Sequence, residues 1–191
     1  MMSISIAEQK SYRRRHHHSI RRSLRLSEWK KMSAQVVKRM ISTQEFISAN
    51  TIHTYVSMEK NREVCTFNFI NSCIEAGKEV IVPRMHPEGR LTHHKITSTE
   101  SLSRNKWGVY EPPGDREVEI SDDILVVVPM VAADYKCNRL GYGKGYYDRF
   151  LSTVKATKVG FCFTCNLSWD LLPVDTFDVK MDKIITNQFD L

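Results

Sequence analysis

The sequence predicts an α/β protein of three layers, in which a mainly parallel, Rossmann-like sheet has helices on both faces. Two observations lead to this prediction: an apolar strand at 124–128, and the alternation of β-branched runs with segments of helical periodicity. A chain of 191 residues can bury a real core, so we expect a single domain over 1–191. With 41% hydrophobic and 26% charged residues, a fibrous or wholly disordered chain is excluded.

Residues 27–77 are expected to contain two helices and the first strand. Apolar residues recur at three- and four-residue spacing over 27–48, which predicts one helix. The β-branched run 51–57 predicts a strand. Thr66 is expected to cap a second helix that ends at Gly77.

The remaining strands follow from short apolar runs. The sequence predicts a buried strand at 79–83 and a short strand near 91–96. The run 124–128 is the clearest interior strand, and a loop and a helix follow it. Further strands are expected at 158–165 and 183–186, so that strands and helices alternate as in βαβ units.

The net charge of +6 lies entirely in a basic N-terminal helical segment, residues 1–25. This segment has one acid, Glu8, and seven cations, which are Lys10, Arg13, Arg14, Arg15, Arg21, Arg22 and Arg25. The rest of the chain is neutral, which argues against a nucleic-acid-binding protein, although a basic arm of that kind remains a lesser alternative. No apolar stretch is long enough for a membrane span and no secretory signal is present, so we expect a cytoplasmic protein without a membrane partner.

The cysteines and histidines are expected to be structural. Five cysteines without disulfide spacing indicate small core residues in a reducing cytoplasm, and this includes Cys162 and Cys165. A zinc site would need a second pair, which the sequence lacks. The triple histidine 16–18 is interpreted as a solvated helical turn, because consecutive side chains on a helix cannot converge on one ion.

The segment 138–151, NRLGYGKGYYDRFL, contains the strongest indication of chemistry. It follows the clearest strand, and ligands bind at the carboxyl ends of strands in α/β folds. Its alternate glycines are Gly141, Gly143 and Gly145. Glycines allow backbone N–H groups to approach a phosphate, and Arg139 and Lys144 could neutralise its charge.

Spacing alone leaves alternatives open for this loop. It matches neither the P-loop pattern nor the dinucleotide fingerprint. Asp148, in the first turn of the helix, could hold Mg²⁺. The structural alternative is a glycine-rich turn with a solvated Lys144 and a helix-capping Asp148.

This run closely resembles the signature of the 5-formyltetrahydrofolate cyclo-ligase family, also called 5,10-methenyltetrahydrofolate synthetases. The preceding segment 126–137 resembles the family's strand and loop entry, with Met130 and Ala133 in place of the usual Gly and Phe. Weaker similarities occur in the family's order at 63–66 (EVCT), 82–84 (VPR), 107–112 (WGVYEP) and 180–183 (KMDK). The resemblance covers nearly the whole chain from Lys10 onward.

The N-terminal segment is similar to the family's K-x-x-L-R motif, whose cations contact ATP. Lys10 and Arg14 fit this motif, with Arg13 where Leu is usual. A rival alignment would use Arg21 and Arg25 instead.

The resemblance implies a reaction in which 5-formyltetrahydrofolate closes to 5,10-methenyltetrahydrofolate while ATP becomes ADP and phosphate. Phosphorylation of the formyl oxygen makes it a leaving group, and N10 then attacks the same carbon. The protein's task is positioning and charge neutralisation. ATP and Mg²⁺ are therefore the expected cofactors and 5-formyltetrahydrofolate the expected partner, in a monomer.

The resemblance also implies roles for individual residues. Lys144 and Arg139 are the expected catalytic residues, and Asp148 and Asp182 are expected to position the metal. The residues implied for the nucleotide are Lys10, Arg14, Arg139, Leu140, Gly141, Tyr142, Gly143, Lys144, Gly145, Tyr146 and Tyr147. The residues implied for the folate are Val56, Met58, Glu63, Trp107, Tyr142, Gly143, Lys144, Gly145 and Tyr146. Departures at Cys65, Met130, Ala133 and Tyr142 leave open a relative with the same phosphate loop and another substrate.

Overall fold

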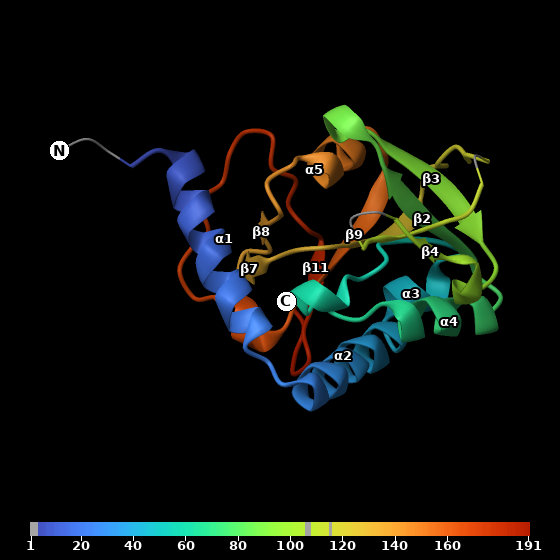
Figure 1. The fold of residues 1–191 in the computed structure, drawn as a ribbon, viewed down its shortest axis with the longest axis horizontal. Helices are drawn as coiled ribbons and strands as arrows, with labels where there is room; N and C mark the ends of the chain where they lie inside the picture. The colour runs from blue at the N-terminus through green and yellow to red at the C-terminus, as the bar shows by residue number, and fades with distance from the viewer. Residues whose placement is uncertain (1–3, 106–107, 115) are drawn as a thin grey trace.

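A six-stranded sheet forms the centre of the computed structural model, which describes residues 4–105, 108–114 and 116–191 (Figure 1). Every strand runs parallel to its neighbours except β3, which pairs antiparallel with β2. The sequence prediction of a mainly parallel α/β sheet is therefore confirmed. In spatial order the strands are β11 (Lys183–Ile185), β9 (Ala156–Phe161), β6 (Ile124–Val128), β1 (Thr51–Thr54), β2 (Glu79–Met85) and β3 (Leu91–Ile96).

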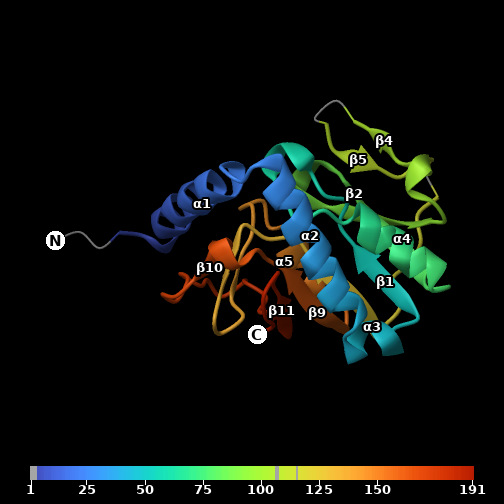
Figure 2. The same ribbon diagram turned by 90° about the horizontal axis from the view of Figure 1, so that it is seen from below.

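Helices cover both faces of this sheet unequally. One face carries α2 (Leu26–Ile41), α3 (Gln44–Ser48) and α4 (Phe67–Glu75), and the other carries the short α5 (Tyr146–Leu151) (Figures 1 and 2). The N-terminal helix, α1 (Ile6–Arg22), lies beside the sheet rather than over it. None of the helices in the described ranges has the length and apolar character that a bilayer crossing requires.

The core lies against both faces of β6, whose residues are all buried. On the α2–α4 side, the rings of Phe69 and Phe161 pack with centroids 5.3 Å apart. On the α5 side, Phe150 packs against His53 of β1 at 4.8 Å. An apolar strand without alternation is therefore explained by helices on both sides.

Two shorter sheets complete the fold. One has the order β10 (Leu167–Ser168), β7 (Ala132–Asp134), β8 (Arg139–Leu140), and the other pairs β4 (Ser103–Arg104) with β5 (Tyr110–Glu111). These two- and three-residue strands are too short to leave a periodic pattern in the sequence, so the loop expected after β6 contained no predicted strand.

Several predicted boundaries were wrong. The helix predicted over 27–48 is two helices, because Thr43 accepts a hydrogen bond from the Phe46 amide and starts α3. The strand predicted over 51–57 ends at Thr54. The side chain of Thr66 does not cap α4; its hydroxyl donates to the Tyr55 carbonyl at 2.8 Å.

The ends of the later strands also differ from the prediction. The strand predicted over 79–83 continues to Met85, because β3 pairs with it beyond Pro83. The strand predicted over 158–165 is β9, which begins and ends earlier. Cys165 consequently lies in a 3₁₀ turn and is exposed, so the expectation of a core cysteine was wrong there. The last strand stops at Ile185, one residue earlier than predicted.

The strand order creates a crevice between β1 and β6. From β1 the chain proceeds to β2 and β3 on one side, and from β6 it proceeds to β9 and β11 on the other. The carboxyl ends of β1 and β6 thus diverge, which makes this edge the expected ligand-binding point of an open α/β sheet. The glycine loop follows β6 at this edge.

Candidate active site

The loop between β6 and α5 is held in shape by Asp134, which is fully buried at the end of β7. Its Oδ1 accepts hydrogen bonds from the amides of Lys136 and Asn138 at 2.9 and 3.0 Å. Its Oδ2 accepts one from the Leu172 amide at 2.9 Å. One carboxylate therefore ties the entry of the glycine loop to the C-terminal segment.

The glycines allow arginine side chains to approach the loop backbone. Gly143 and Gly145 have φ values of +88° and +68°, a region that other residues rarely adopt. A Cβ on Gly143 would lie 3.0 Å from Cζ of Arg14, and one on Gly141 would lie 2.7 Å from Nη1 of Arg139. Side chains at these positions would displace both guanidinium groups.

A cavity of about 700 Å³ lies between this loop, α1 and the C-terminal segment. Cations from distant parts of the sequence line it: Lys10 and Arg14 from α1, Arg139 from β8 and Arg149 from α5. Three carboxylates, Asp148, Asp175 and Asp178, share its wall. We call this space the cationic cavity.

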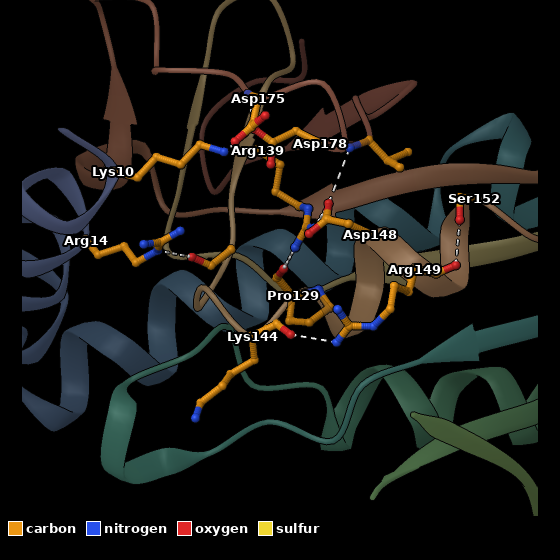
Figure 3. Close-up of polar contacts among 12 residues, drawn as sticks. Lys10, Arg14, Pro129, Arg139, Lys144, Asp148, Arg149, Ser152, Asp175 and Asp178 are labelled. Carbon is orange, nitrogen blue, oxygen red and sulfur yellow. Dashed lines mark hydrogen bonds and ion pairs between the residues drawn. The ribbon is translucent and has the colours of Figure 1, made fainter. Parts of the chain in front are cut away.

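The charged groups of the cationic cavity pair with one another. Lys10 forms an ion pair with Asp178, and Arg139 forms one with Asp148 (Figure 3). Arg14 donates from Nε to the Gly141 carbonyl at 2.8 Å, and burial lowers the pKa of its guanidinium. The buried Nε of Arg139 has no hydrogen-bond partner among the described residues, so it is a donor available to an anion.

A second cavity of about 330 Å³ is lined by the same loop. We call it the apolar cavity, since Val56, Met58, Pro83 and Leu91 contribute to its wall. Both cavities contact Arg139, Gly141, Gly143, Gly145 and Asp148. The glycine loop is thus a partition between a charged space and an apolar one.

The acid of the apolar cavity is Glu63, which is only 4% exposed. Its Oε2 accepts a hydrogen bond from the Met58 amide at 2.5 Å, and its Oε1 accepts one from the Tyr142 hydroxyl. Burial raises the pKa of Glu63, while these hydrogen bonds oppose the rise. The Trp29 indole donates to the Glu63 carbonyl at 2.5 Å and fixes the backbone.

Arg21 lies behind Tyr142 and is almost fully buried. It donates to the Tyr142 hydroxyl at 2.6 Å, to the Met130 carbonyl at 2.8 Å and to the Asn61 carbonyl at 2.7 Å. A charge-assisted chain therefore runs from Arg21 through Tyr142 to Glu63. Burial and the neighbouring Glu63 raise the pKa of Tyr142, which stays a neutral donor.

The structure brings most of the predicted site residues together. Val56, Met58, Glu63, Tyr142 and Tyr146 line the apolar cavity. Tyr147 lines it too, and its buried hydroxyl has no partner within the described ranges. Lys10, Arg14 and Leu140 line the cationic cavity. Lys144 lines the apolar cavity, and its side chain is exposed and points away from Arg139 and Asp148 (Figure 3).

Two predicted site residues are not part of this group. Asp182 lines neither cavity; it pairs with Lys158 at 2.9 Å and accepts a hydrogen bond from the Lys158 amide. Trp107 lies outside the described residues. The carboxylates that the C-terminal segment contributes to the same cavity as Asp148 are instead those of Asp175 and Asp178.

Two buried residues of α1, His17 and Arg21, were not predicted as parts of the site, although their spacing contains a weak signal. Lys10, Arg14, His17 and Arg21 are spaced four, three and four residues apart, so they lie on one helical face. This spacing could have indicated a buried polar face on α1. His17 is 4% exposed, which corrects the expectation of a solvated turn at 16–18. Of the rival alignment, Arg25 is exposed and pairs with Glu28, and Arg21 contacts Tyr142. Neither lines the cationic cavity, whereas Lys10 and Arg14 both do.

The donor set fits a magnesium–nucleotide complex better than a free metal ion. The described residues contain no cluster of three or more His, Cys, Asp or Glu side chains that could hold a metal. Mg²⁺ is commonly bound by one or two carboxylates together with substrate phosphates and water. Asp148 and Asp178 could supply the carboxylates, and the unpaired Nε of Arg139 suits a phosphate oxygen.

Comparison with known proteins identifies the family of the chain. The family model described as "5-formyltetrahydrofolate cyclo-ligase family" matches residues 6–187. A probable 5-formyltetrahydrofolate cyclo-ligase of Schizosaccharomyces pombe is 32% identical over 170 residues, which cover 81% of this chain and 83% of that protein. The 5-formyltetrahydrofolate cyclo-ligase of Escherichia coli K12 is 31% identical over 173 residues, 87% and 93% of the two chains.

Solved structures show the same architecture. The NMR structure of Aquifex aeolicus 5,10-methenyltetrahydrofolate synthetase matches with a TM-score of 0.80 at 28% identity, over 95% of this chain and 91% of that chain. A 5,10-methenyltetrahydrofolate synthetase from Mycoplasma pneumoniae matches with a TM-score of 0.73 at 19% identity, over 94% of this chain and 99% of that chain. At this identity the match supports the fold alone. With a family match over almost its entire length, this chain belongs to the 5-formyltetrahydrofolate cyclo-ligase family.

Proposed function

We propose that this protein converts 5-formyltetrahydrofolate to 5,10-methenyltetrahydrofolate with the consumption of Mg·ATP and the release of ADP and phosphate. The observation that carries the proposal is the glycine loop shared by two cavities of opposite character. A triphosphate suits the cationic cavity and a pterin suits the apolar one. The reacting groups would then meet at the loop between them.

The nucleotide phosphates would be held by Lys10, Arg14 and Arg139, with the backbone of Leu140–Tyr147 around them. Arg14 and Arg139 are held in place by the carbonyls of Gly141 and Pro129, so they are oriented before the nucleotide arrives. A preorganised donor needs little rearrangement as charge develops. The dipole of α5 would add little, because this helix has only 6 residues.

Magnesium would neutralise phosphate charge while bound to Asp148 and Asp178. Asp178 would take the role that the sequence had assigned to Asp182, because Asp178 lines the cavity with Asp148 and the amide of the next residue, Val179, donates to Asp148, whereas Asp182 lines neither cavity. Both carboxylates are paired with cations in this structure. Lys10 and Arg139 would therefore exchange a carboxylate partner for a phosphate when the complex binds.

Glu63 would recognise the pterin through the N–H donors of its ring. Its two oxygens each accept one hydrogen bond from the protein, which leaves lone pairs for substrate. Val56 and Met58 would contact the apolar faces of the ring. A buried acid at the end of an apolar cavity gives orientation as well as affinity.

The chemistry requires activation of a formamide. The formyl oxygen attacks the terminal phosphorus, and the bond from that phosphorus to the ADP oxygen breaks. N10 then attacks the formyl carbon, the carbon–oxygen bond breaks to release phosphate, and N10 loses its proton. Lys144 and Arg139 would neutralise charge on the transferred group, and the loop would hold N10 near the formyl carbon.

The departures from the family pattern give little support to a different substrate. Met130 and Ala133 are buried and line neither cavity. Cys65 also lies outside both cavity walls. Only Tyr142 lines the apolar cavity, where it orients Glu63.

A spectroscopic assay of the purified protein tests the proposal. Mixing the protein with 5-formyltetrahydrofolate and Mg·ATP should produce the methenyltetrahydrofolate absorbance only when all components are present. Lys144→Ala should lower kcat by about a hundredfold, because one charge-stabilising group is lost. Lys136→Ala is the matched control, since Lys136 is exposed and lines neither cavity. Wild-type protein without ATP-dependent product, or full activity in Lys144→Ala, would contradict the corresponding claim.

We also propose that the chain acts as a single-domain monomer in the cytoplasm. The free cysteines support a reducing compartment. Sedimentation of the purified protein and fractionation of cells test these two statements.

A further inference from the structure

An aromatic side chain of the cationic cavity is exposed without a packing role. Phe177 is 84% exposed and lines this cavity. When a ligand covers a large apolar ring that was exposed to water, the free energy falls, and this favours binding. None of the ring contacts found in the described part of the chain involves Phe177.

The turn that carries Phe177 is fixed rather than loose. The Asp175 amide donates to Oδ2 of Asp178 at 2.7 Å, and the Asp178 amide donates to the Asp175 carbonyl at 3.1 Å. Lys10 of α1 holds the same Asp178 carboxylate. The ring is therefore presented from a turn that two elements stabilise, and little conformational entropy would be lost on binding.

The cationic cavity has an apolar part beside its charged part. Ala7 lies three residues before Lys10 on α1, and Phe177 lies next to Asp178, so both apolar residues adjoin the ion pair. A ligand that suits this wall has an anionic group at one end and a flat apolar group at the other. A nucleotide has this distribution of charge and aromatic surface.

We infer that Phe177 is the platform on which the base of the bound nucleotide stacks. This inference rests on the proposed function, because it assumes that ATP occupies the cationic cavity. A base stacks on an aromatic side chain through its flat face. Because every base has such a face, this contact tolerates different bases. Phe177 is therefore a binding residue for the base and not for the phosphates.

Equilibrium binding to the full chain, measured by titration calorimetry, separates these contributions. The titrants are Mg·ATP and Mg·tripolyphosphate, which has the phosphates without the base. Phe177→Ala should weaken the affinity for Mg·ATP about tenfold and leave the affinity for Mg·tripolyphosphate unchanged. Phe177→Trp should restore the affinity for Mg·ATP. Trp169→Ala is the matched control: Trp169 is 80% exposed on the same segment and lines neither cavity, so its loss should change neither titration.

Other results overturn the inference. Unchanged Mg·ATP affinity in Phe177→Ala, or an equal loss for both titrants, would mean that the ring does not hold the base. Failure of the wild-type protein to bind Mg·ATP would instead contradict the proposed function on which the inference rests. Concentration-dependent sedimentation that Phe177→Ala abolishes would assign the exposed ring to contact with a second copy of the chain.

Discussion

The chain from Arg21 through Tyr142 to Glu63 shows how a surplus of N-terminal arginine acquires a structural role. Arg21 is buried and donates to two carbonyls and a phenol. A buried guanidinium without these acceptors would be strongly destabilising. The same contacts orient Glu63, the acid of the apolar cavity. Both the stability of the fold and the geometry of this cavity therefore depend on Arg21.

Removal of the Tyr142 hydroxyl should disturb folate binding selectively. Tyr142→Phe leaves Glu63 with one donor fewer and one Arg21 N–H without an acceptor. We expect the KM for 5-formyltetrahydrofolate to rise about tenfold while the KM for ATP stays unchanged. The pKa of Glu63, which burial raises, should rise further because an opposing hydrogen bond is lost. The acidic limb of kcat/KM for folate should therefore move to higher pH.

Tyr146→Phe is the control for this pH profile. Tyr146 lines the same cavity, but its hydroxyl donates to the His86 carbonyl at 2.7 Å and not to Glu63. An acidic limb that moves equally in both variants would show that Tyr142 has no special link to Glu63.

The helix α1 illustrates how one element joins two cavities. Its inward face carries Lys10 and Arg14 at the cationic cavity and Arg21 behind the apolar one. The helix begins at a capping box in which Ser5 accepts from the Glu8 amide and the Glu8 carboxylate accepts from the Ser5 amide. The cap therefore fixes the turn that presents Lys10.

Weakening this cap should affect the nucleotide more than the folate. Ser5→Ala should cost about 1 kcal/mol of helix stability and fray the first turn. We expect a several-fold higher KM for ATP and an unchanged KM for folate. Thr43→Ala is the control, because Thr43 caps α3 in the same way and lines neither cavity. Equal effects of the two variants on the KM for ATP would contradict a role for α1 in binding.

The whole molecule encloses histidines that are neutral when folded. Burial lowers the pKa of His17 and His93 to about 4, and it lowers the pKa of His53 well below the usual value. The unfolded chain binds these protons near the ordinary histidine pKa of about 6.5. Their neutral burial is therefore fully stabilising above that pH, and it is lost as the pH falls from about 6.5 towards 4.

The urea midpoint should accordingly fall between pH 7 and pH 5. His17→Leu should make this fall shallower, because both ring nitrogens of His17 lack partners among the described residues and no hydrogen bond is lost. Ser19→Leu should leave the slope unchanged, since Ser19 is exposed on the same helix and has no titratable side chain. The same slope in His17→Leu and in the wild-type protein would contradict this assignment.

Patterns that are local in sequence were predictable. The strand β6 was predicted with its observed bounds, because five consecutive buried residues are recognisable without knowledge of the partners. The glycine loop and the family resemblance were equally local. The exposed Cys165 and the divided helix at Thr43 were not, because local hydrogen bonds override periodicity at the ends of elements.

By itself, the sequence determined the α/β class, the glycine-rich loop after the central strand and the family of this protein. Only the tertiary structure decided that Asp178 and not Asp182 shares a cavity with Asp148, why Arg21 is buried, and that one loop lines two cavities. These features depend on contacts across the chain, such as Lys10 with Asp178 and Tyr142 with Glu63. Residue spacing carries no direct information about such contacts, because the strand order brings distant segments to one edge of the sheet.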